Sequence, residues 1–389
     1  MSLSENRVRL ERVYYPITKY MKDYNSDSRI VLTLDAGGTN MVFGAMRGGE
    51  FIVNPLTLPS NSDNLDLCLN TMVQGFQTII ESLEEAPVAI SFAFPGPADY
   101  PNGIIGGYLP NFPSFRDGVA LGPFLQDRFD IPVFINNDGD LFAYGEAICG
   151  ALPEVNRRLK DAGSAKRYCN MLGYTFGTGF GVGMVVDGRL NRGDNSCVET
   201  FCLKHKRYQD VIVEEGVSVR AVKRVYGSLS GNQEHGLEPK DIYEIAEGVR
   251  EGDKEAARSA FAEMGEIAGD AMAAAVTLTD GLIVIGGGIT AARKYIMPSL
   301  LKELRSSIKT LTGDVLSRVQ MKVYDLDNEI EFAAFCMGEQ RELTVYGTDR
   351  KVNYDPQKRI GVLISKLGAS KAISVGAYSF ALSQLDNQK

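Results

Sequence analysis

Three glycine-rich turns in the sequence could each place backbone amides around phosphate groups. The turns are Gly37-Gly38-Thr39-Asn40, the seven residues from Gly177 to Gly183, and Gly286-Gly287-Gly288. Glycine permits positive φ and close approach of the backbone, so successive N–H groups can converge on phosphate oxygens. Thr39 and Thr178 can add hydroxyl donors. One such turn is typical of any tight hairpin, but three of them, with Asp138 at a strand end between the first and the second, favour phosphate binding.

The first turn joins two strands, which distinguishes it from the common nucleotide motifs. Apolar residues from Ile30 to Leu34 predict a buried strand before the turn, and Met41 to Met46 predict a second strand after it. In Rossmann and P-loop proteins the glycines instead begin a helix. The chain has no Gly-Lys dipeptide, so a Walker A motif is absent.

Strands and helices alternate along the rest of the chain, which predicts an α/β fold. Asn137 and Asp138 directly follow one of these strands, and the second glycine turn lies between two others. Two strand-glycine-strand units that are far apart in the sequence indicate two related lobes facing a cleft. After the first hairpin, we expect strands at 88–94, 132–135, 170–176, 184–186 and 282–285, and helices at 65–83 and 261–275.

Composition narrows the class of protein. The chain has 389 residues, of which 44% are apolar and 23% charged, with a net charge of -8. This length exceeds the usual size of one core, so we expect two lobes, and the acidic balance disfavours a nucleic-acid surface. No apolar stretch has the length of a signal peptide core or of a membrane span, and six scattered cysteines are typical of a reducing compartment. We therefore expect a soluble cytoplasmic protein with no nucleic-acid or membrane partner.

The three turns resemble the nucleotide loops of the actin/hexokinase/Hsp70 superfamily. Residues 35–40 are similar to its first phosphate loop, 177–183 to its second, and 286–289 to its adenosine-binding turn. Within that superfamily the chain resembles the ROK family of sugar kinases (repressor, open reading frame, kinase), and the resemblance runs from Arg29 to Leu382, with an unfamiliar stretch near 335–365. The motifs that carry it lie at 93–99, 109–112, 137–146, 177–193 and 372–378.

The resemblance implies a two-lobed actin-like ATPase fold (ribonuclease H-like), with ATP and a sugar bound in the cleft between the lobes. Residues 29–140 would form an N-terminal α/β lobe, completed by a C-terminal helix at about 372–386, and 141–371 would form the C-terminal lobe. Residues 1–28 would be an N-terminal extension, in which the weakly amphipathic stretch from Val8 to Met21 predicts a helix. The family also suggests a homodimer, which the sequence itself leaves open.

The resemblance further implies ATP-dependent phosphorylation of a sugar hydroxyl and assigns roles to residues. Asp138 would be the general base that accepts the hydroxyl proton, and Asp35 would hold Mg²⁺ through water. Taken alone, the Asn137-Asp138 pair would be interpreted as a turn or a helix cap. The residues expected to bind the sugar are Asn111, Asn137, Asp138, Glu199 and Glu214, with Glu215 as the alternative to Glu214. Those expected to hold ATP are Asp35, Gly37, Gly38, Thr39, Asn40, Gly177, Thr178, Gly179, Gly181, Gly286, Gly287 and Gly288.

The sequence departs from the family pattern at the sugar-binding motif Gly-Glu-x-Gly-His. Its best match is Val198-Glu199-Thr200-Phe201-Cys202, which keeps the Glu but has Cys202 in place of the His. The family's zinc-binding cysteine cluster is also missing. Cys197, Cys202 and His205 would supply only three ligands, whereas structural zinc wants four, so we predict no zinc and half-buried thiols. Asp140, where the family often has Asn, is interpreted as a helix N-cap.

The leading hypothesis is a hexose kinase of the glucokinase type. Fructose or an N-acetylated hexosamine is the nearest alternative substrate, because a few hydrogen bonds decide between sugars. A sugar-sensing transcriptional regulator is the alternative from another class; it calls for an N-terminal DNA-binding domain, and we expect the 28 residues before Arg29 to be too few for one. A binding-only protein is the third hypothesis, and it rests on the missing His.

Overall fold

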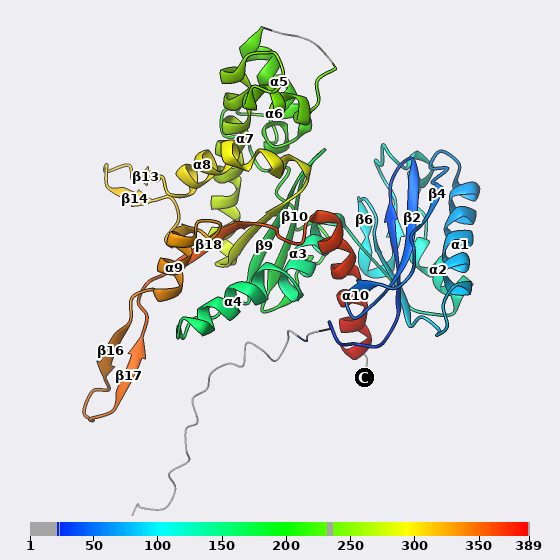
Figure 1. Cartoon of the computed structure of the whole chain (residues 1–389), viewed down its shortest axis with the longest axis horizontal. Coiled ribbons are helices and arrows are strands. Elements are labelled where there is room, and N and C mark those ends of the chain that lie inside the picture. Colours follow the sequence, from blue (N-terminus) through cyan, green and yellow to red (C-terminus); the bar gives the residue numbers. More distant parts are fainter. Residues whose placement is uncertain (1–21, 23, 232–235, 388–389) are drawn as a thin grey trace, which may run out of the picture.

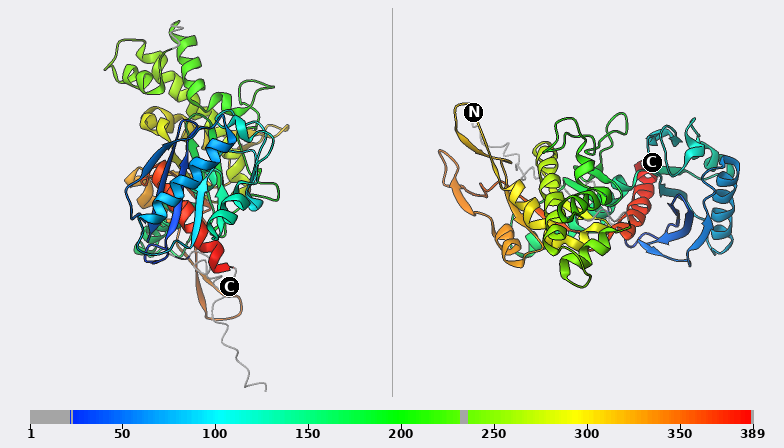
Figure 2. Two further views of the ribbon diagram at one scale, coloured as in Figure 1. Left: turned by 90° about the vertical axis from the view of Figure 1, so that its right-hand side faces the viewer. Right: turned by 90° about the horizontal axis from the view of Figure 1, so that it is seen from above.

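The structure of the chain is a computed structural model that describes residues 22, 24–231 and 236–387. It consists of two α/β lobes, each built on a six-stranded sheet (Figure 1). The lobes lie side by side, with the first sheet in blue and cyan and the second mainly in green and yellow (Figure 2). The predicted two-lobed α/β fold is therefore confirmed, whereas the helix predicted from Val8 to Met21 lies outside the described residues.

Six strands form the sheet of the first lobe. They are β1 (Val31–Ala36), β2 (Asn40–Arg47), β3 (Glu50–Phe51), β4 (Leu56–Pro59), β5 (Ala89–Ala93) and β8 (Val133–Asn136). The order is β3-β2-β1-β5-β8, with β4 also paired to β2. β1 is antiparallel to β2 and parallel to β5, which is parallel to β8. One face packs on α1 (Leu65–Glu81) and α2 (Leu121–Phe129) around Phe43, Phe76 and Phe92.

The long helix α10 (Ala369–Asn387) covers the other face of this sheet, where it contacts β1, β5 and β8. It also packs on α3 (Asp138–Ile148) at two glycines. A Cβ on Gly145 would lie 2.0 Å from the carbonyl oxygen of Ala372, and one on Gly376 would lie 2.0 Å from that of Leu141. Only glycine allows two helix backbones to approach this closely, and the contact fixes the start of α3 relative to the first sheet.

The sheet of the second lobe repeats the arrangement of the first. Its strands are β9 (Met171–Phe176), β10 (Phe180–Val186), β11 (Arg189–Leu190), β12 (Leu282–Gly286), β15 (Lys322–Asp325) and β18 (Arg359–Ile364). The order is β11-β10-β9-β12-β18-β15. As in the first lobe, a hairpin of antiparallel strands (β9 and β10) is followed by parallel neighbours. The two hairpins carry the first and second glycine turns, as predicted.

Helices cover both faces of the second sheet (Figure 1). One face packs on α3, α4 (Ala151–Asp161) and α9 (Glu329–Met337), and the other on α5 (Val219–Ser230), α6 (Pro239–Glu247), α7 (Lys254–Thr279) and α8 (Arg293–Leu304). The apolar face predicted between Phe261 and Ala275 is confirmed in α7. The remaining short elements are β6 (Ala98–Asp99), β7 (Ile104–Ile105), and 3-10 turns η2 (Tyr100–Asn102), η3 (Pro113–Phe115), η4 (Val213–Gly216) and η5 (Gly288–Ala292).

Two hairpins project from the second lobe. The first arm, residues 306–318, contains β13 (Ser307–Lys309) and β14 (Val315–Ser317), and the second arm, residues 338–355, contains β16 (Arg341–Thr344) and β17 (Lys351–Tyr354). Both arms leave the lobe at the end away from the first sheet (Figures 1 and 2). The unfamiliar stretch near 335–365 thus contains the end of α9, the second arm and β18.

The second glycine turn is shorter than predicted. β10 begins at Phe180 rather than at Met184, so Gly181 and Gly183 are strand residues. The reason is a tertiary contact, because a Cβ on Gly183 would lie 2.3 Å from the carbonyl oxygen of Gly139 in α3. Glycine here lets a strand cross a helix closely, which the local pattern could not reveal.

The boundaries of the lobes that the sequence predicts, at about residues 140 and 371, stay a prediction. The strands of the first sheet end at Asn136 and those of the second begin at Met171, so they fall on either side of the first boundary. Across the part of the chain that the structure describes, no helix combines the length and the apolar character needed to cross a bilayer.

Candidate active site

Asp35 and Asp138 stand at the carboxyl ends of β1 and β8, two parallel strands that lie on either side of β5. The registers pair Asp35 with Ala93 and Ala93 with Asn136, so β1, β5 and β8 end in a row. Asn137 follows β8 and caps α3, because its Oδ1 accepts a hydrogen bond of 2.6 Å from an amide in the first turn of the helix. Asp138 is therefore the first residue of α3, where the partial positive charge of a helix N-terminus favours a carboxylate.

The Asp138 carboxyl group is accessible and has no competing partner. It makes no hydrogen bond or ion pair with the residues that the structure describes, and together with Asp35 it lines a cavity of about 630 Å³ beside β2 and α10. Desolvation by burial, with the negative charge of Asp35, raises the pKa of Asp138 to about 6. A group with this pKa is ionised at neutral pH and still attracts a proton, which suits a general base.

The first phosphate loop is held in a fixed turn. The amide of Gly37 donates a hydrogen bond of 3.0 Å to the carbonyl oxygen of Asn40, and a Cβ on Gly37 would lie 2.8 Å from that oxygen. The hydroxyl groups of Ser60 and Ser62 both donate to the carbonyl oxygen of Gly38. These two serines, which the sequence analysis missed, anchor the carbonyl group of the loop to the segment after β4.

Asn111 lies against this loop. A Cβ on Gly38 would be 3.1 Å from the Cβ of Asn111, so the predicted sugar-binding Asn and the predicted ATP-binding loop are in contact. The side chains of Thr39, Asn40 and Asn111 are all exposed. The first lobe thus presents polar side chains and backbone amides on one surface beside Asp35.

The second and third glycine turns lie against each other. Gly287 has a φ of +95°, and a Cβ there would lie 2.3 Å from the carbonyl oxygen of Phe176, the last residue of β9. Gly177 and Gly288 face open space, since no atom beyond their chain neighbours lies within 4 Å of a Cβ built on either. Thr178 is exposed beside them. This open space leaves room for phosphate groups beside the two turns, while the amide of Gly177 itself donates a hydrogen bond of 3.2 Å to the carbonyl oxygen of Gly179.

The other predicted ATP-binding glycines have packing reasons of their own. A Cβ on Gly286 would lie 2.6 Å from the ring of Phe142, and one on Gly179 would lie 2.6 Å from the carboxylate of Glu214. Gly181 lies within β10. These glycines allow the loops to approach their neighbours, and their part in ATP binding stays a prediction.

Asn137 and Glu199 meet across the cleft floor. The side-chain amide of Asn137 donates a hydrogen bond of 3.0 Å to Oε1 of Glu199. Desolvation, with the nearby charges of Asp140 and Glu214, raises the pKa of Glu199 to about 8. Two of the predicted sugar-binding residues are thus in direct contact, and a third is close enough to act on their charge.

Glu214 lies at the second phosphate loop. Its Oε2 accepts a hydrogen bond of 3.0 Å from the amide of Phe180, and its Oε1 forms an ion pair of 2.8 Å with Arg220. The Glu214 carboxylate therefore holds the second glycine turn in place, and its charge also acts on Glu199. This double contact was not foreseen, because neither Phe180 nor Arg220 belongs to a motif that the sequence analysis quoted for the sugar.

Asp140 is not the N-cap that the sequence suggested. The N-cap is Asn137, and Asp140 is the third residue of α3, with only 3% of its surface exposed. Burial raises the pKa of Asp140 to about 7, which the charge of Arg192 partly offsets. The interpretation failed because the helix begins three residues earlier than an Asp140 cap requires.

Arg192 joins the two lobes at the base of the site, and the sequence analysis missed it. Its Nη1 donates a hydrogen bond of 2.9 Å to Oδ1 of Asn136 at the end of β8. Its guanidinium lies 5.3 Å from the centroid of the Phe380 ring in α10. The Arg192 guanidinium therefore helps to position Asn136 and the residues that lead to Asp138. In the sequence, the only sign of this role is a single Arg next to Gly193.

The region of the missing family His differs from expectation. Cys197 and Cys202 are exposed rather than half-buried, because the loop after β11 lies on the surface. His205 is 3% exposed, and its Nδ1 accepts a hydrogen bond of 3.1 Å from the amide of Arg207. Within the described ranges, no three His, Cys, Asp or Glu side chains gather as a metal cluster. The expectation of no zinc stays a prediction.

The Asp35 carboxylate and the glycine turns suit a magnesium–nucleotide complex. The Asp35 carboxylate is exposed at the end of β1 and has no ion-pair partner among the described residues. A hard carboxylate oxygen is the ligand type that Mg²⁺ prefers. The exposed hydroxyl of Thr178 and the open space beside Gly177 and Gly288 can receive phosphate oxygens, so the residues present fit both groups.

Comparison with known proteins agrees with this geometry. A solved glucokinase from Parabacteroides distasonis ATCC 8503 is 61% identical, with a TM-score of 0.86, over 93% of this chain and 99% of that chain. The glucokinase of Thermotoga maritima is 25% identical over 310 residues, which cover 70% of this chain and 89% of that enzyme. The xylose repressor of Bacillus spizizenii is 30% identical over 138 residues, so the match spans only 31% of the repressor's length.

The sequence profile of the ROK family matches residues 31–324. That span contains both glycine hairpins, Asp138 and the third turn, and it covers well over half of the chain. The chain belongs to the ROK family.

Proposed function

We propose that this chain is an ATP-dependent hexose kinase of the glucokinase type. The observation that carries the proposal is the Asp138 carboxyl group, which is unpartnered among the described residues, has a pKa raised to about 6, and stands beside the first phosphate loop. The similarity to the glucokinase from Parabacteroides distasonis, 61% identical over 93% of this chain, supports glucose as the acceptor sugar.

Asp138 acts as the general base. It accepts the proton of the attacking sugar hydroxyl while that oxygen forms its bond to the γ-phosphorus of ATP and the bond from this phosphorus to the bridging oxygen of ADP breaks. The protonated carboxyl group then releases its proton to water. Phosphoryl transfer needs positioning and charge neutralisation more than covalent help, which agrees with a site rich in amides and carboxylates.

Both lobes contribute to sugar binding in this proposal. Asn111 comes from the first lobe, whereas Glu199 and Glu214 come from the second, and Asn137 connects them through its bond to Glu199. Hydrogen bonds from these groups orient the hydroxyl toward Asp138, which supplies the proximity contribution to the rate. Closure of the lobes on the sugar would exclude water and limit ATP hydrolysis.

The ATP phosphates lie between the two glycine hairpins in this proposal. The amides of Gly38, Thr39 and Thr178 and the hydroxyls of the two threonines donate to phosphate oxygens, and Gly288 adjoins the adenosine. Asp35 holds Mg²⁺ through water. When bound, the cation neutralises the charge that develops on the transferred phosphoryl group.

A coupled assay of ADP release with Mg-ATP tests the proposal. The acceptors are glucose, fructose, mannose, N-acetylglucosamine and N-acetylmannosamine, which separate the glucokinase hypothesis from the fructokinase and hexosamine kinase alternatives. We expect turnover with glucose. Asp138→Asn should lower kcat by a factor on the order of 100 to 10,000, with glucose binding retained in calorimetry. Asp161→Asn, an exposed carboxylate on α4, is the matched control and should leave kcat unchanged.

The outcomes are distinct. Preference for another of the five sugars would keep the kinase and replace its substrate. An absence of turnover with every sugar, in a protein that binds ATP, would overturn the proposal and favour the sensor or binding-only hypothesis.

A further inference from the structure

The two arms of the second lobe have no core of their own. Every residue in β13, β14, β16 and β17 is exposed, and each arm has only two strands. An isolated two-stranded hairpin is only marginally stable in water. A contact beyond those within the described chain would therefore stabilise both arms.

The arms and the neighbouring helix α9 present an unusual amount of apolar surface. Nearly half of the large apolar side chains that are exposed in the described part of the chain lie between residues 307 and 354. Leu311 and Tyr346, at the tips of the two arms, are 110% and 101% exposed, and Ile330 on α9 is 83% exposed. Such a concentration marks a surface for association, and tyrosine is enriched among residues that dominate binding.

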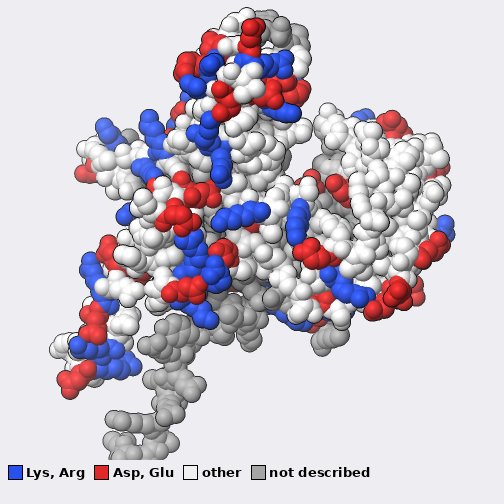
Figure 3. Space-filling view, viewed as in Figure 1, with Lys and Arg blue, Asp and Glu red and all other residues white. Residues whose placement is uncertain are grey.

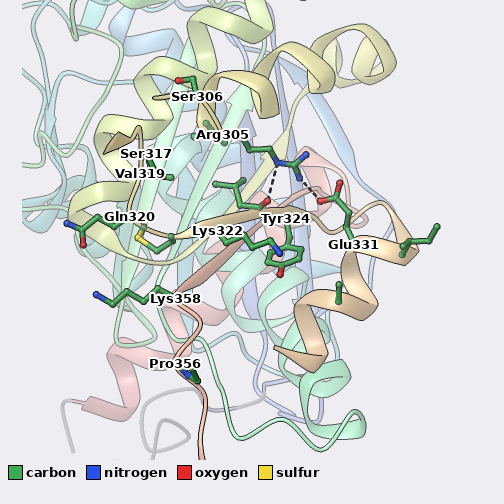
Figure 4. Close-up of a pocket in the computed structure, with 15 residues that line it drawn as sticks. Arg305, Ser306, Ser317, Val319, Gln320, Lys322, Tyr324, Glu331, Pro356 and Lys358 are labelled. Atoms are coloured by element: carbon green, nitrogen blue, oxygen red, sulfur yellow. Dashed lines mark hydrogen bonds and ion pairs between the residues drawn. The ribbon is translucent and has the colours of Figure 1, made fainter. Parts of the chain in front are cut away.

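A groove of about 850 Å³ lies between the roots of the arms (Figure 4). It is far from Asp35 and Asp138, which line a different cavity. Its apolar residues include Val319, Met321 and Pro356, and its cations are Arg305, Lys322 and Lys358. We call it the edge groove, because it runs along β15, the last strand of the second sheet.

The edge of β15 is closed to a further strand. The Nε of Arg305 donates a hydrogen bond of 3.1 Å to the carbonyl oxygen of Val323, and the amide of Asp325 donates one of 2.8 Å to Glu331. Arg305 and Glu331 also form an ion pair of 2.5 Å (Figure 4). Side chains that occupy an edge in this way prevent strand addition, so an occupant of the groove must bind through its side chains.

We propose that the edge groove receives the second arm of another copy of this chain, so that two copies exchange these arms around a two-fold axis. The second arm lies at the same end of the molecule as α9 and the root of the first arm, which line the groove (Figure 1). A self-complementary interface requires that arm and groove share one face in this way. Each limb of the arm has about eight residues, and at about 3.3 Å per residue it reaches about 25 Å, enough to cross to a partner.

Charge favours the second arm as the occupant. The groove carries three cations against the carboxylate of Glu331, whereas residues 338–355 carry four carboxylates and three cations. Within the arm, Glu339 pairs with Arg341 and Glu342 pairs with Lys351. Asp349 near the tip has no ion-pair partner among the described residues and can meet the cations of the groove. Charges of both signs alternate with neutral surface on the arms (Figure 3).

The size of the surface also fits a second copy. A stable interface takes about 800 Å² from each partner, and a single buried tyrosine supplies about 150–250 Å². The second arm carries Tyr346 and Tyr354 together with Leu343 and Val352, all exposed. Exchange around a two-fold axis buries this set twice, once in each groove.

Sedimentation velocity of the full chain over the micromolar range tests the proposal. We expect a dimer, whose dissociation constant rises about tenfold or more in the double variant Leu343→Ser, Tyr346→Ser. Lys358→Glu in the groove should weaken the dimer as well. Leu278→Ser, which removes an 88% exposed leucine at the end of α7, is the matched control and should have no effect. Circular dichroism and thermal melting show that each variant is folded.

Cross-linking between mixed copies tests the arrangement itself. Protein with Tyr346→Cys mixed with protein with Gln320→Cys, a groove residue, should form a disulfide-linked heterodimer, whereas each variant alone should form much less. A monomeric wild type would overturn the proposal and leave the arms to a partner of another kind. A dimer that tolerates the arm and groove variants, or a Tyr346→Cys protein that links mainly to itself, would overturn it too.

Discussion

The side-chain amide of Asn137 donates a hydrogen bond of 3.0 Å to Oε1 of Glu199, while the oxygen of the same amide caps α3. One side chain therefore connects the helix that begins with Asp138 to the loop after β11 in the second lobe. The cap on α3 fixes the direction of the Asn137 amide, and this amide in turn holds the carboxyl group of Glu199. Asn137 thus places both Asp138, the proposed general base, and Glu199, a proposed sugar-binding residue.

Glu199→Gln should raise the KM for the hexose by about 10- to 100-fold, with a smaller effect on kcat. The amide keeps the shape of the side chain but removes the carboxyl group, which with a pKa of about 8 is mostly protonated at neutral pH and can both donate to and accept from sugar hydroxyl groups. Steady-state kinetics with saturating Mg-ATP measures the effect, and Glu255→Gln, an exposed carboxylate on α7 paired with Arg258, is the control. An unchanged KM in Glu199→Gln would remove this residue from the sugar site.

The activity should rise with pH as Asp138 loses its proton. The pKa of Asp138 is about 6 because of desolvation and the charge of Asp35. Below that pH the carboxyl group is protonated and cannot accept the proton of the hydroxyl, so kcat/KM should increase through about pH 6 to a plateau. A profile with hexose as the limiting substrate measures this limb. A flat profile between about pH 5 and pH 7 would contradict the assigned base.

Asp140→Asn should stabilise the protein at alkaline pH. Burial raises the pKa of Asp140 to about 7, so folding favours its protonated form. The stability associated with that proton is fully present below the pKa of the unfolded chain and is lost as the pH rises through about 7. The variant should gain on the order of 1–2 kcal/mol over the wild type at about pH 8.5 and little at about pH 5.

Urea unfolding at the two pH values measures the Asp140 effect. Asp161→Asn, a change at an exposed carboxylate on α4, should show no such dependence on pH. An equal gain in the free energy of unfolding at both pH values would mean that the protonation of Asp140 is not its cause.

Asp355→Asn should lower the free energy of unfolding by about 3–5 kcal/mol. The side chain of Arg359 is fully buried and forms an ion pair of 2.6 Å with Asp355 at the root of the second arm. Loss of the carboxylate leaves a buried cation without a charged partner. Glu339→Gln, which breaks an exposed pair with Arg341, should cost less than about 1 kcal/mol. Equal effects of the two changes in urea unfolding would contradict this account.

Features with a local cause could be predicted from the sequence. The strand at Val31–Ala36, the glycine turn and the strand at Asn40–Arg47 follow from β-type residues around glycine, and the structure confirms them. The apolar face of α7 follows from helical periodicity alone. The residue types of the site could also be predicted, because carboxylates and amides that directly follow parallel strands lie at one edge of a sheet.

Features with a tertiary cause could not be predicted. Gly183 is required by the crossing of β10 over α3, and Arg192 reaches Asn136 from a loop that is far away in the sequence. The cap at Asn137 rather than Asp140 depends on where β8 ends. The exposure of Cys202 and the projection of the arms likewise depend on what the rest of the chain leaves uncovered.

Helix α10 has a consequence for the order in which the molecule is assembled. It covers one face of the first sheet, yet it follows every strand of both sheets in the chain. During synthesis, apolar residues on that face, such as Val31 and Ala89, therefore stay exposed until the whole second lobe has been made. Early folding of an N-terminal domain, the usual course in multidomain chains, can reach only a half-covered state here. The native first lobe and the cleft then form in one late step, when α10 packs on α3.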